Sequence, residues 1–257
     1  MLILFEIQDE NWDDIEASVK AFQDTLMAIK YFEKPVVAAP FGLTLAGGCE
    51  ICLSSTLVRA AAETYMGLVE VGVGLIPAGG GTKEMLLRCT EGIPPGILDA
   101  DLLPFVRQAF ETVAMAKVAT STKEAQKFGF MRSTDKITIN RDHLLHDAKR
   151  TVLDLVREGY RPPRPKKNIK LMGERGYALL QMGLFYMREG GYISQYDEHV
   201  AKKLAYIMSG GNLPDGTEVT EQYLLDLERE AFMSLCGEPR TQERIEYTLK
   251  TGRPLRN

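Results

Sequence analysis

Apolar and polar positions alternate with a helical period near the start of the 257-residue chain. Within residues 13–32 the apolar side chains recur every three or four positions, so they would share one face of a helix. They are Ile15, Val19, Phe22, Leu26 and Ile29. The Lys34-Pro35 pair ends this predicted helix, because the residue before a proline disfavours helical backbone. Residues 35–42 are almost wholly apolar and predict a short buried strand.

Short segments of alternating type follow this strand. Residues 47–54 predict a helix that opens at two glycines, and residues 56–62 and 64–68 predict short strands. A glycine-rich loop then covers residues 69–82, and a further helix begins at Thr82. This order of strand, helix and strand predicts an α/β fold.

The second half of the chain has mainly helical patterns. After a connecting loop over residues 91–103, we expect helices at 104–117, 121–128 and 142–158, and then from about Gly173 onward with a break at 209–220. Residues 161–170 combine prolines with five basic side chains and predict an exposed linker. We therefore divide the chain into a core, residues 1–140, and a helical C-terminal extension, residues 141–257.

The composition is that of an ordinary globular protein and excludes several classes of function. Hydrophobic residues make up 45% and charged residues 26%, and the net charge of −4 makes nucleic acid an unexpected partner. No apolar run approaches the roughly 18–20 residues of a membrane span, so membrane insertion is not expected. The acidic start of the chain differs from a signal peptide, so we expect a cytoplasmic protein. The four cysteines suggest no disulfide framework, and no second Cys or His pair completes a metal site.

Two glutamates lie in unusually apolar surroundings. Glu50 follows a run of small residues in LTLAGGCEIC, and Glu70 lies within GLVEVGVGLIP. Burial there would raise the pKa of each carboxyl and suit it to proton transfer near neutral pH. Two such acids that face one water would form a general acid/base pair. The alternative is two separate carboxylates that accept hydrogen bonds from backbone N–H groups, and a spacing of twenty residues does not decide between them.

The glycines beside Glu50 have two interpretations. A helix that begins at Gly47 leaves N–H groups free, and these could stabilise a developing oxyanion. The alternative is a tight turn with close backbone packing. The later run Gly72-x-Gly74-x-x-Pro77 lacks the third glycine of the dinucleotide-binding fingerprint, so a nucleotide site is not supported there.

Taken together, residues 33–88 resemble the crotonase (enoyl-CoA hydratase/isomerase) family. A K-P-V-x-A strand leads through a glycine-rich turn to a helix with a glutamate, and a second glutamate follows twenty residues later. A G-L-x-P-x-x-G-G-T loop completes the pattern. The resemblance implies a partial crotonase (ClpP-like) fold with short strands and helices, followed by the mainly helical extension.

The resemblance also implies the chemistry. The Gly47 N–H would be one donor to the thioester oxygen, and Glu50 and Glu70 would hold the water that adds across the C2=C3 double bond. The backbone N–H of Ala78 would help to hold that water. Coenzyme A would arrive with the substrate, no metal or resident cofactor is implied, and NAD would serve only a separate dehydrogenase domain. The presence of both glutamates favours a hydratase over an isomerase.

The ends of the match differ from a complete crotonase. The glycine-glutamate motif begins at about residue 46, so the resemblance implies that the first strands and the second oxyanion donor are absent. The region after residue 140 is similar to the tail of bacterial proteins that join a 3-hydroxyacyl-CoA dehydrogenase to a hydratase. We therefore expect a C-terminal fragment that assembles as a homo-oligomer and hydrates enoyl-CoA poorly by itself. The alternatives are an isomerase or other crotonase-type enzyme, and an acyl-CoA-binding or structural fragment.

Overall fold

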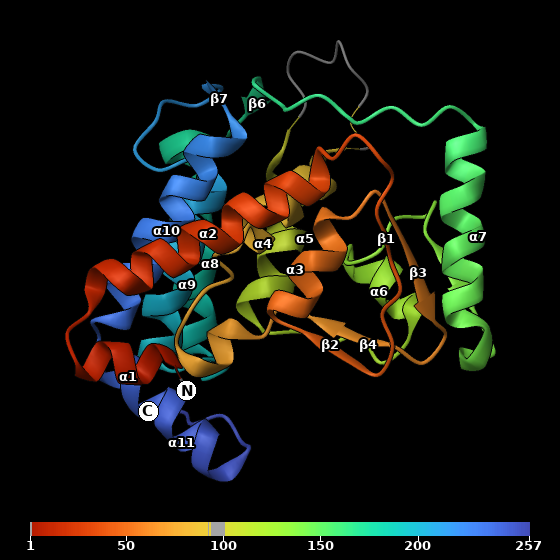
Figure 1. Cartoon of the computed structure of the whole chain (residues 1–257). Helices are drawn as coiled ribbons and strands as arrows, with labels where there is room; N and C mark the ends of the chain where they lie inside the picture. The colour runs from red at the N-terminus through yellow and green to blue at the C-terminus, as the bar shows by residue number, and fades with distance from the viewer. Residues whose placement is uncertain (1, 92, 94–100) are drawn as a thin grey trace.

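The computed structural model describes residues 2–91, 93 and 101–257 (Figure 1). The helices are α1 (Leu2–Gln8), α2 (Trp12–Lys30), α3 (Gly47–Ser54), α4 (Gly81–Thr90), α5 (Leu103–Ala114), α6 (Thr122–Phe128), α7 (Leu144–Arg157), α8 (Gly173–Glu189), α9 (Gln195–Ser209), α10 (Glu221–Cys236) and α11 (Pro239–Thr251), with the short 3₁₀ helices η1 (Glu70–Val73) and η2 (Arg141–His143). The strands are β1 (Val37–Ala38), β2 (Leu43–Leu45), β3 (Leu57–Ala61), β4 (Tyr65–Gly67), β5 (Lys136–Thr138), β6 (Ile169–Lys170) and β7 (Glu218–Val219).

The strands form three small sheets among many helices. Strands β1, β3 and β5 are parallel neighbours in that order, and β2 pairs with β4 in parallel. Strands β6 and β7 form a separate antiparallel pair. Two parallel neighbouring strands need a crossover connection between them. The connection from β2 to β4 consists of helix α3 and strand β3. The predicted α/β fold with a helical C-terminal region is confirmed.

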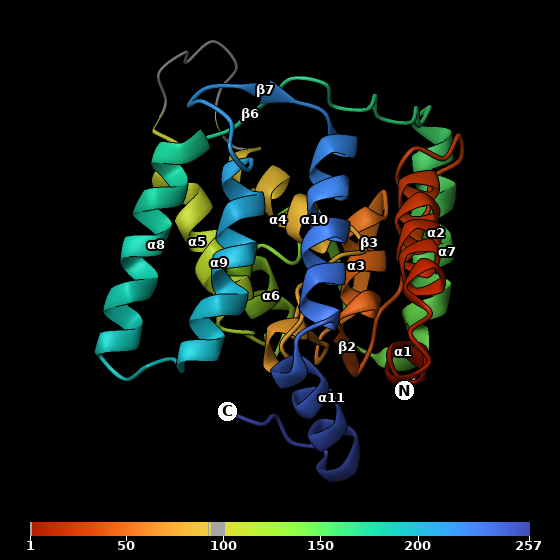
Figure 2. The same ribbon diagram turned by 90° about the vertical axis from the view of Figure 1, so that its left-hand side faces the viewer.

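The C-terminal helices pack on the first half of the chain. Figure 2 shows α8, α9 and α10 side by side, and α10 also packs against α2 and α4. One cluster of buried apolar side chains runs through both halves and includes Leu53 and Val58 as well as Leu204 and Leu235. No contact or comparison tests the boundary at residue 140, which stays a prediction.

A buried ionic cluster, which we call the Lys-Glu quartet, joins three of these helices. The quartet consists of Lys30 on α2, Lys83 and Glu84 on α4, and Glu221 on α10. Lys83 Nζ lies 2.6 Å from Glu84 Oε1 and 2.9 Å from Glu221 Oε2, and Lys30 Nζ makes the same two contacts at 2.6 and 2.9 Å. Two cations therefore neutralise two carboxylates at the junction of the two halves of the chain.

Most elements agree with the predictions, and the exceptions are short. Helix α3 has the predicted bounds, whereas β1 covers only two residues of the apolar segment 35–42. The loop 69–82 contains the 3₁₀ helix η1, and the predicted loop 91–103 lies largely outside the described residues. Strands β5, β6 and β7 were not predicted, because two or three residues are too few for an alternating pattern. None of the helices in the described ranges is both long and apolar enough to cross a membrane.

Candidate active site

The first turn of α3 is set by an unusual backbone conformation at Ala46. This residue has φ +52° and ψ −127°, a region that normally favours glycine. Its N–H donates to the Gly67 carbonyl at 2.9 Å, and its carbonyl accepts from the N–H groups of Cys49 and Glu50 at 2.8 and 3.0 Å. The N–H of Gly47 has no hydrogen-bond partner among the described residues, as the start of a helix predicts.

The four predicted site residues line one cavity of about 560 Å³. Gly47, Glu50, Glu70 and Ala78 share this cavity with apolar side chains from α2 and α10. These apolar residues are Ile15, Val19, Phe22 and Phe232. The spacing along the sequence left open whether the two glutamates meet, and the structure places them at the same cavity.

Glu50 is held by two backbone donors from the glycine-rich loop. Its Oε1 accepts from the N–H of Gly79 at 2.9 Å and from the N–H of Gly81 at 2.8 Å. A Cβ at either glycine would lie 2.7 Å from a Glu50 oxygen, so both positions must lack a side chain. Burial raises the pKa of Glu50 to about 7, although the two N–H groups and Lys83 oppose the shift.

Glu70 begins η1 and reaches the same cavity from the other side of the loop. Its Oε2 is buried and has no hydrogen-bond partner within the described part of the chain. Burial, followed by the neighbouring charge of Glu50, raises its pKa to about 8. Two carboxyls that disfavour each other's charge would exchange protons near neutral pH, as general acid/base chemistry requires.

The glycine-rich loop after Glu70 is fixed by Gln23, a residue that the sequence analysis missed. Gln23 lies on α2 and is 1% exposed. Its Nε2 donates to the Ala78 carbonyl at 2.7 Å and to the Leu225 carbonyl of α10 at 2.9 Å. The peptide that joins Ala78 to Gly79 is thus held at its carbonyl by Gln23 and at its N–H by Glu50. The N–H of Ala78 itself makes no hydrogen bond to another described residue.

Helix α11 holds the turn that follows Glu70. Thr241 Oγ1 lies 2.8 Å from the Gly74 carbonyl and donates to it, and it lies 2.6 Å from the Tyr196 hydroxyl. Gly74 has φ +81°, and a Cβ there would lie 2.8 Å from Thr241 Oγ1. A C-terminal helix therefore fixes the turn that follows Glu70.

A third buried carboxyl, Glu228, lies on α10 and was also missed. Its Oε1 accepts from the Lys83 N–H at 2.5 Å, while its Oε2 is buried without a partner among the described residues. Burial and the nearby Glu50 raise its pKa well above the ordinary range. A signal for it existed, because Glu228 shares a helical face with Leu224, Leu225 and Phe232.

The cysteines and histidines contribute no chemistry to this cavity. All four cysteines are unpaired, and burial raises the pKa of Cys49, Cys52, Cys89 and Cys236. Within the described ranges, no group of three His, Cys, Asp or Glu side chains is arranged to hold a metal ion. Cys49 and Cys52 are buried and belong to the apolar core cluster.

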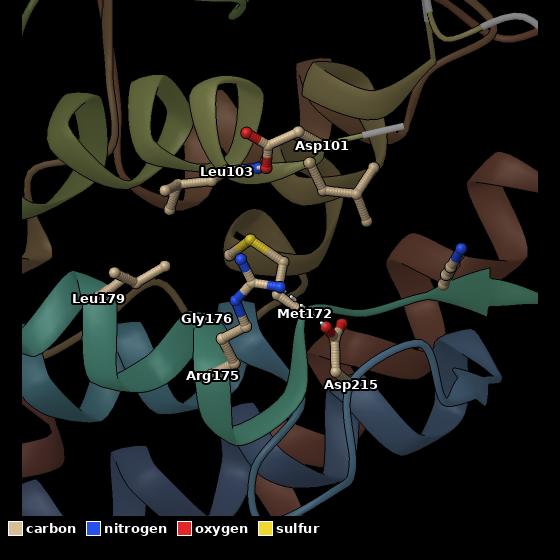
Figure 3. A pocket seen from close by; sticks show the side chains of 9 residues that line it. Asp101, Leu103, Met172, Arg175, Gly176, Leu179 and Asp215 are labelled. Atoms are coloured by element: carbon tan, nitrogen blue, oxygen red, sulfur yellow. Dashed lines mark hydrogen bonds and ion pairs between the residues drawn. The ribbon is translucent and has the colours of Figure 1, made fainter. Parts of the chain in front are cut away.

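A separate cavity of about 460 Å³ lies between α8 and the residues just before α5 (Figure 3). Arg175 and Asp215 approach each other to 3.9 Å on one wall, and Asp101 lies on the opposite wall. Both members of the ion pair are exposed, at 80% and 55% for their side chains, so the pair is loosely held. None of the predicted site residues lines this cavity.

Comparison with known proteins agrees with the resemblance of the first half. Residues 4–90 match the family described as enoyl-CoA hydratase/isomerase. The whole chain is 49% identical to 32% of a Bacillus subtilis protein named "Probable 3-hydroxyacyl-CoA dehydrogenase". A short-chain-enoyl-CoA hydratase of Clostridium acetobutylicum is 42% identical over 57 residues, which are 22% of each chain. The chain spans about a third of the length of the curated relatives that it matches almost throughout.

Solved structures show the same fold. The enoyl-CoA hydratase from Bacillus halodurans superimposes with a TM-score of 0.56 and 16% identity, over 95% of this chain and 73% of that one. At this identity the likeness concerns the fold alone, which is that of the crotonases.

Proposed function

We propose that the chain is the hydratase part of a fatty-acid β-oxidation enzyme, because residues 4–90 match the enoyl-CoA hydratase/isomerase family. The proposed reaction adds water to a trans-2-enoyl-CoA and gives a 3-hydroxyacyl-CoA. One observation carries the proposal. Two carboxyls with raised pKa, Glu50 and Glu70, line a single cavity together with the unpartnered N–H of Gly47. The name of the Bacillus subtilis relative supports a longer protein that is also a 3-hydroxyacyl-CoA dehydrogenase.

The proposed steps follow from the different hydrogen-bond partners of the two carboxyls. Glu50 Oε1 accepts two backbone hydrogen bonds, which favour the ionised carboxylate, so Glu50 acts as the base and takes a proton from water as the water oxygen bonds to C3. The electron pair of the C2=C3 bond moves toward the thioester, whose oxygen accepts a hydrogen bond from the Gly47 N–H as an enolate. Glu70 Oε2 is buried without a hydrogen-bond partner among the described residues, which favours the neutral carboxyl, so Glu70 gives its proton to C2. Ala78 contributes its free N–H to the position of the water.

The remaining parts of the proposal concern binding partners. Coenzyme A enters as part of the substrate, and the reaction uses no resident cofactor or metal. Any NAD would serve the dehydrogenase part of a longer protein. We further propose a cytoplasmic homo-oligomer that binds no nucleic acid.

The direct test replaces Glu50 by Gln. The amide oxygen can still accept from Gly79 and Gly81, so the loop should keep its geometry while the base is lost. We expect the rate of crotonyl-CoA hydration to fall by about 10²–10⁴-fold, the usual contribution of a general base. Thermal unfolding of the variant provides the control for an intact fold.

Three other outcomes would change the assignment. Hydration that continues at the wild-type rate in the Glu50→Gln chain would exclude the proposed base. If the wild-type chain shows no hydration, and both it and the Glu50→Gln variant isomerise a 3-enoyl-CoA, the chain is an isomerase. Binding of crotonyl-CoA without any turnover by the wild-type chain would make it an acyl-CoA-binding domain.

A further inference from the structure

A second polar cavity, of about 310 Å³, lies at the opposite ends of α3 and α4 from the glutamates. Leu53, Ser55 and Thr56 line it at the end of α3, and Arg88 lines it from the last turn of α4. Each helix runs seven residues from the glutamate cavity to this one, or about 10 Å at the usual rise. We call this second space the basic cavity, because six of its lining side chains are basic and two are acidic.

Arg88 is a buried guanidinium that forms no ion pair with a carboxylate of the described residues. Its two terminal nitrogens donate to the carbonyls of Phe130 at 3.1 Å and Leu53 at 2.8 Å. Its Nε is buried and has no partner among the residues that the structure describes. Burial and the neighbouring Arg132 lower the pKa of Arg88 to about 10, and the more distant charges of Glu84 and Asp135 oppose this shift without reversing it. Buried charges are normally paired, so the surroundings of Arg88 favour an anion from outside the chain.

The two acidic residues of the basic cavity do not supply that anion. Glu84 belongs to the Lys-Glu quartet and is already neutralised by Lys30 and Lys83. Glu91 lies 3.2 Å from Arg132, and neither of them forms an ion pair with Arg88. The positive charge of the basic cavity therefore exceeds its negative charge.

The linker of residues 161–170 adds further basic side chains to the lining of the basic cavity. In Figure 1 it crosses one end of the molecule from α7 to β6. Arg161, Arg164 and Lys166 line the basic cavity from it. The Lys166 N–H donates to Glu221 Oε1 at 3.0 Å, which ties the linker to the quartet. The structure thus holds basic side chains from two distant segments over one hollow.

We propose that the basic cavity binds a phosphate group of a small anionic ligand. Guanidinium groups match phosphate oxygens in geometry and charge, and several of them around one hollow give both affinity and orientation. Either a free pyrophosphate or a nucleoside diphosphate presents this chemistry. The site is independent of the proposed hydratase reaction, since it shares no lining residue with the glutamate cavity.

Calorimetric titration of the whole chain with pyrophosphate, and separately with ADP, tests the site. The main variant is Arg161→Gln with Arg164→Gln, which removes two exposed charges with little risk to the fold. The double variant loses the charge-assisted hydrogen bonds of both arginines to the phosphate, so we expect its Kd for either probe to rise by about tenfold or more. The matched control is Lys149→Gln with Arg150→Gln on α7, which removes the same charge from exposed positions outside the basic cavity and should change Kd less than about twofold.

Further titrations identify the class of ligand and show whether the basic cavity is independent of the glutamate cavity. Tighter binding of ADP than of pyrophosphate would assign a nucleotide, and the reverse would assign a free phosphate compound. The Arg88→Lys variant keeps the positive charge but loses the planar guanidinium with its several N–H donors, so it should weaken binding of either probe. Glu50→Gln should leave binding of both probes unchanged. Failure of wild type to bind either probe, or equal weakening by both double variants, would overturn the proposal.

Discussion

Two buried glutamates on neighbouring helices have pKa values that are shifted in opposite directions. Glu50 on α3 is 3% exposed and has a raised pKa, whereas Glu84 on α4 is 1% exposed and has a lowered one. Burial raises the pKa of both, but Lys83 and Lys30 contact Glu84 directly and outweigh it. Glu50 has two backbone N–H groups and only a more distant lysine. The counterions, rather than the depth of burial, make one glutamate structural and leave the other able to exchange protons.

The largest expected effect comes from breaking the quartet. Lys83→Met leaves Glu84 and Glu221 short of a cation in a buried setting, so we expect a loss of about 3–5 kcal/mol in the free energy of unfolding. Chemical denaturation measures it. The double variant Lys83→Met with Glu84→Gln restores the charge balance and should lose less than the single variant. Equal losses would mean that charge pairing is unimportant there. Glu50→Gln, which removes a charge without a direct counterion, is the contrasting control.

A smaller effect is expected when the glycine beside Glu50 gains a side chain. In Gly79→Ala the new Cβ would lie 2.4 Å from Phe22 and 2.7 Å from Glu50 Oε2. We expect a loss of about 1–3 kcal/mol in stability from this overpacking, and about 100-fold in hydration rate if the carboxyl shifts.

Gly48→Ala provides the matched control for that substitution. Its Cβ would meet its nearest neighbour, Thr44, at 3.9 Å, so it should fit. Steady-state kinetics and thermal unfolding of both variants decide the matter. Similar behaviour of the two alanines would contradict the close approach at Gly79.

The sequence predicts those features of Glu50 and Glu84 that depend on neighbouring residues in the chain. It does not predict contacts between residues that are far apart in the chain. The helix with Glu50 and the strand before Glu70 follow from local patterns, and the resemblance to a known family predicted that Gly47 and Ala78 share their site. The lowered pKa of Glu84 depends partly on its sequence neighbour Lys83, but its second counterion, Lys30 on α2, is 54 residues away in the chain and could not be predicted from a local pattern. Gln23 and Thr241 donate to the carbonyls of Ala78 and Gly74, which are 55 and 167 residues away in the chain. Glu228 alone left a local signal, as an acid on an apolar helical face.

The smallest expected effect concerns the strained entry to α3. Ala46→Gly should relieve the cost of a positive φ and raise the free energy of unfolding by up to about 1 kcal/mol. Ala125→Gly is the matched control in the middle of α6, where the same exchange should destabilise by about 1 kcal/mol. Denaturant titration of the pair gives both values. A loss of stability in Ala46→Gly would show that alanine is unstrained at that position.

Carboxyl titration followed by carbon NMR tests the difference between the two glutamates most directly. With all glutamate carboxyl carbons labelled, single Gln variants assign the signals of Glu50, Glu70 and Glu84. We predict that Glu50 and Glu70 titrate near neutral pH, that Glu50→Gln lowers the pKa of Glu70, and that Glu84 stays ionised below the ordinary glutamate range. Ordinary pKa values near 4 for both Glu50 and Glu70 would contradict the account of an acid/base pair in this cavity.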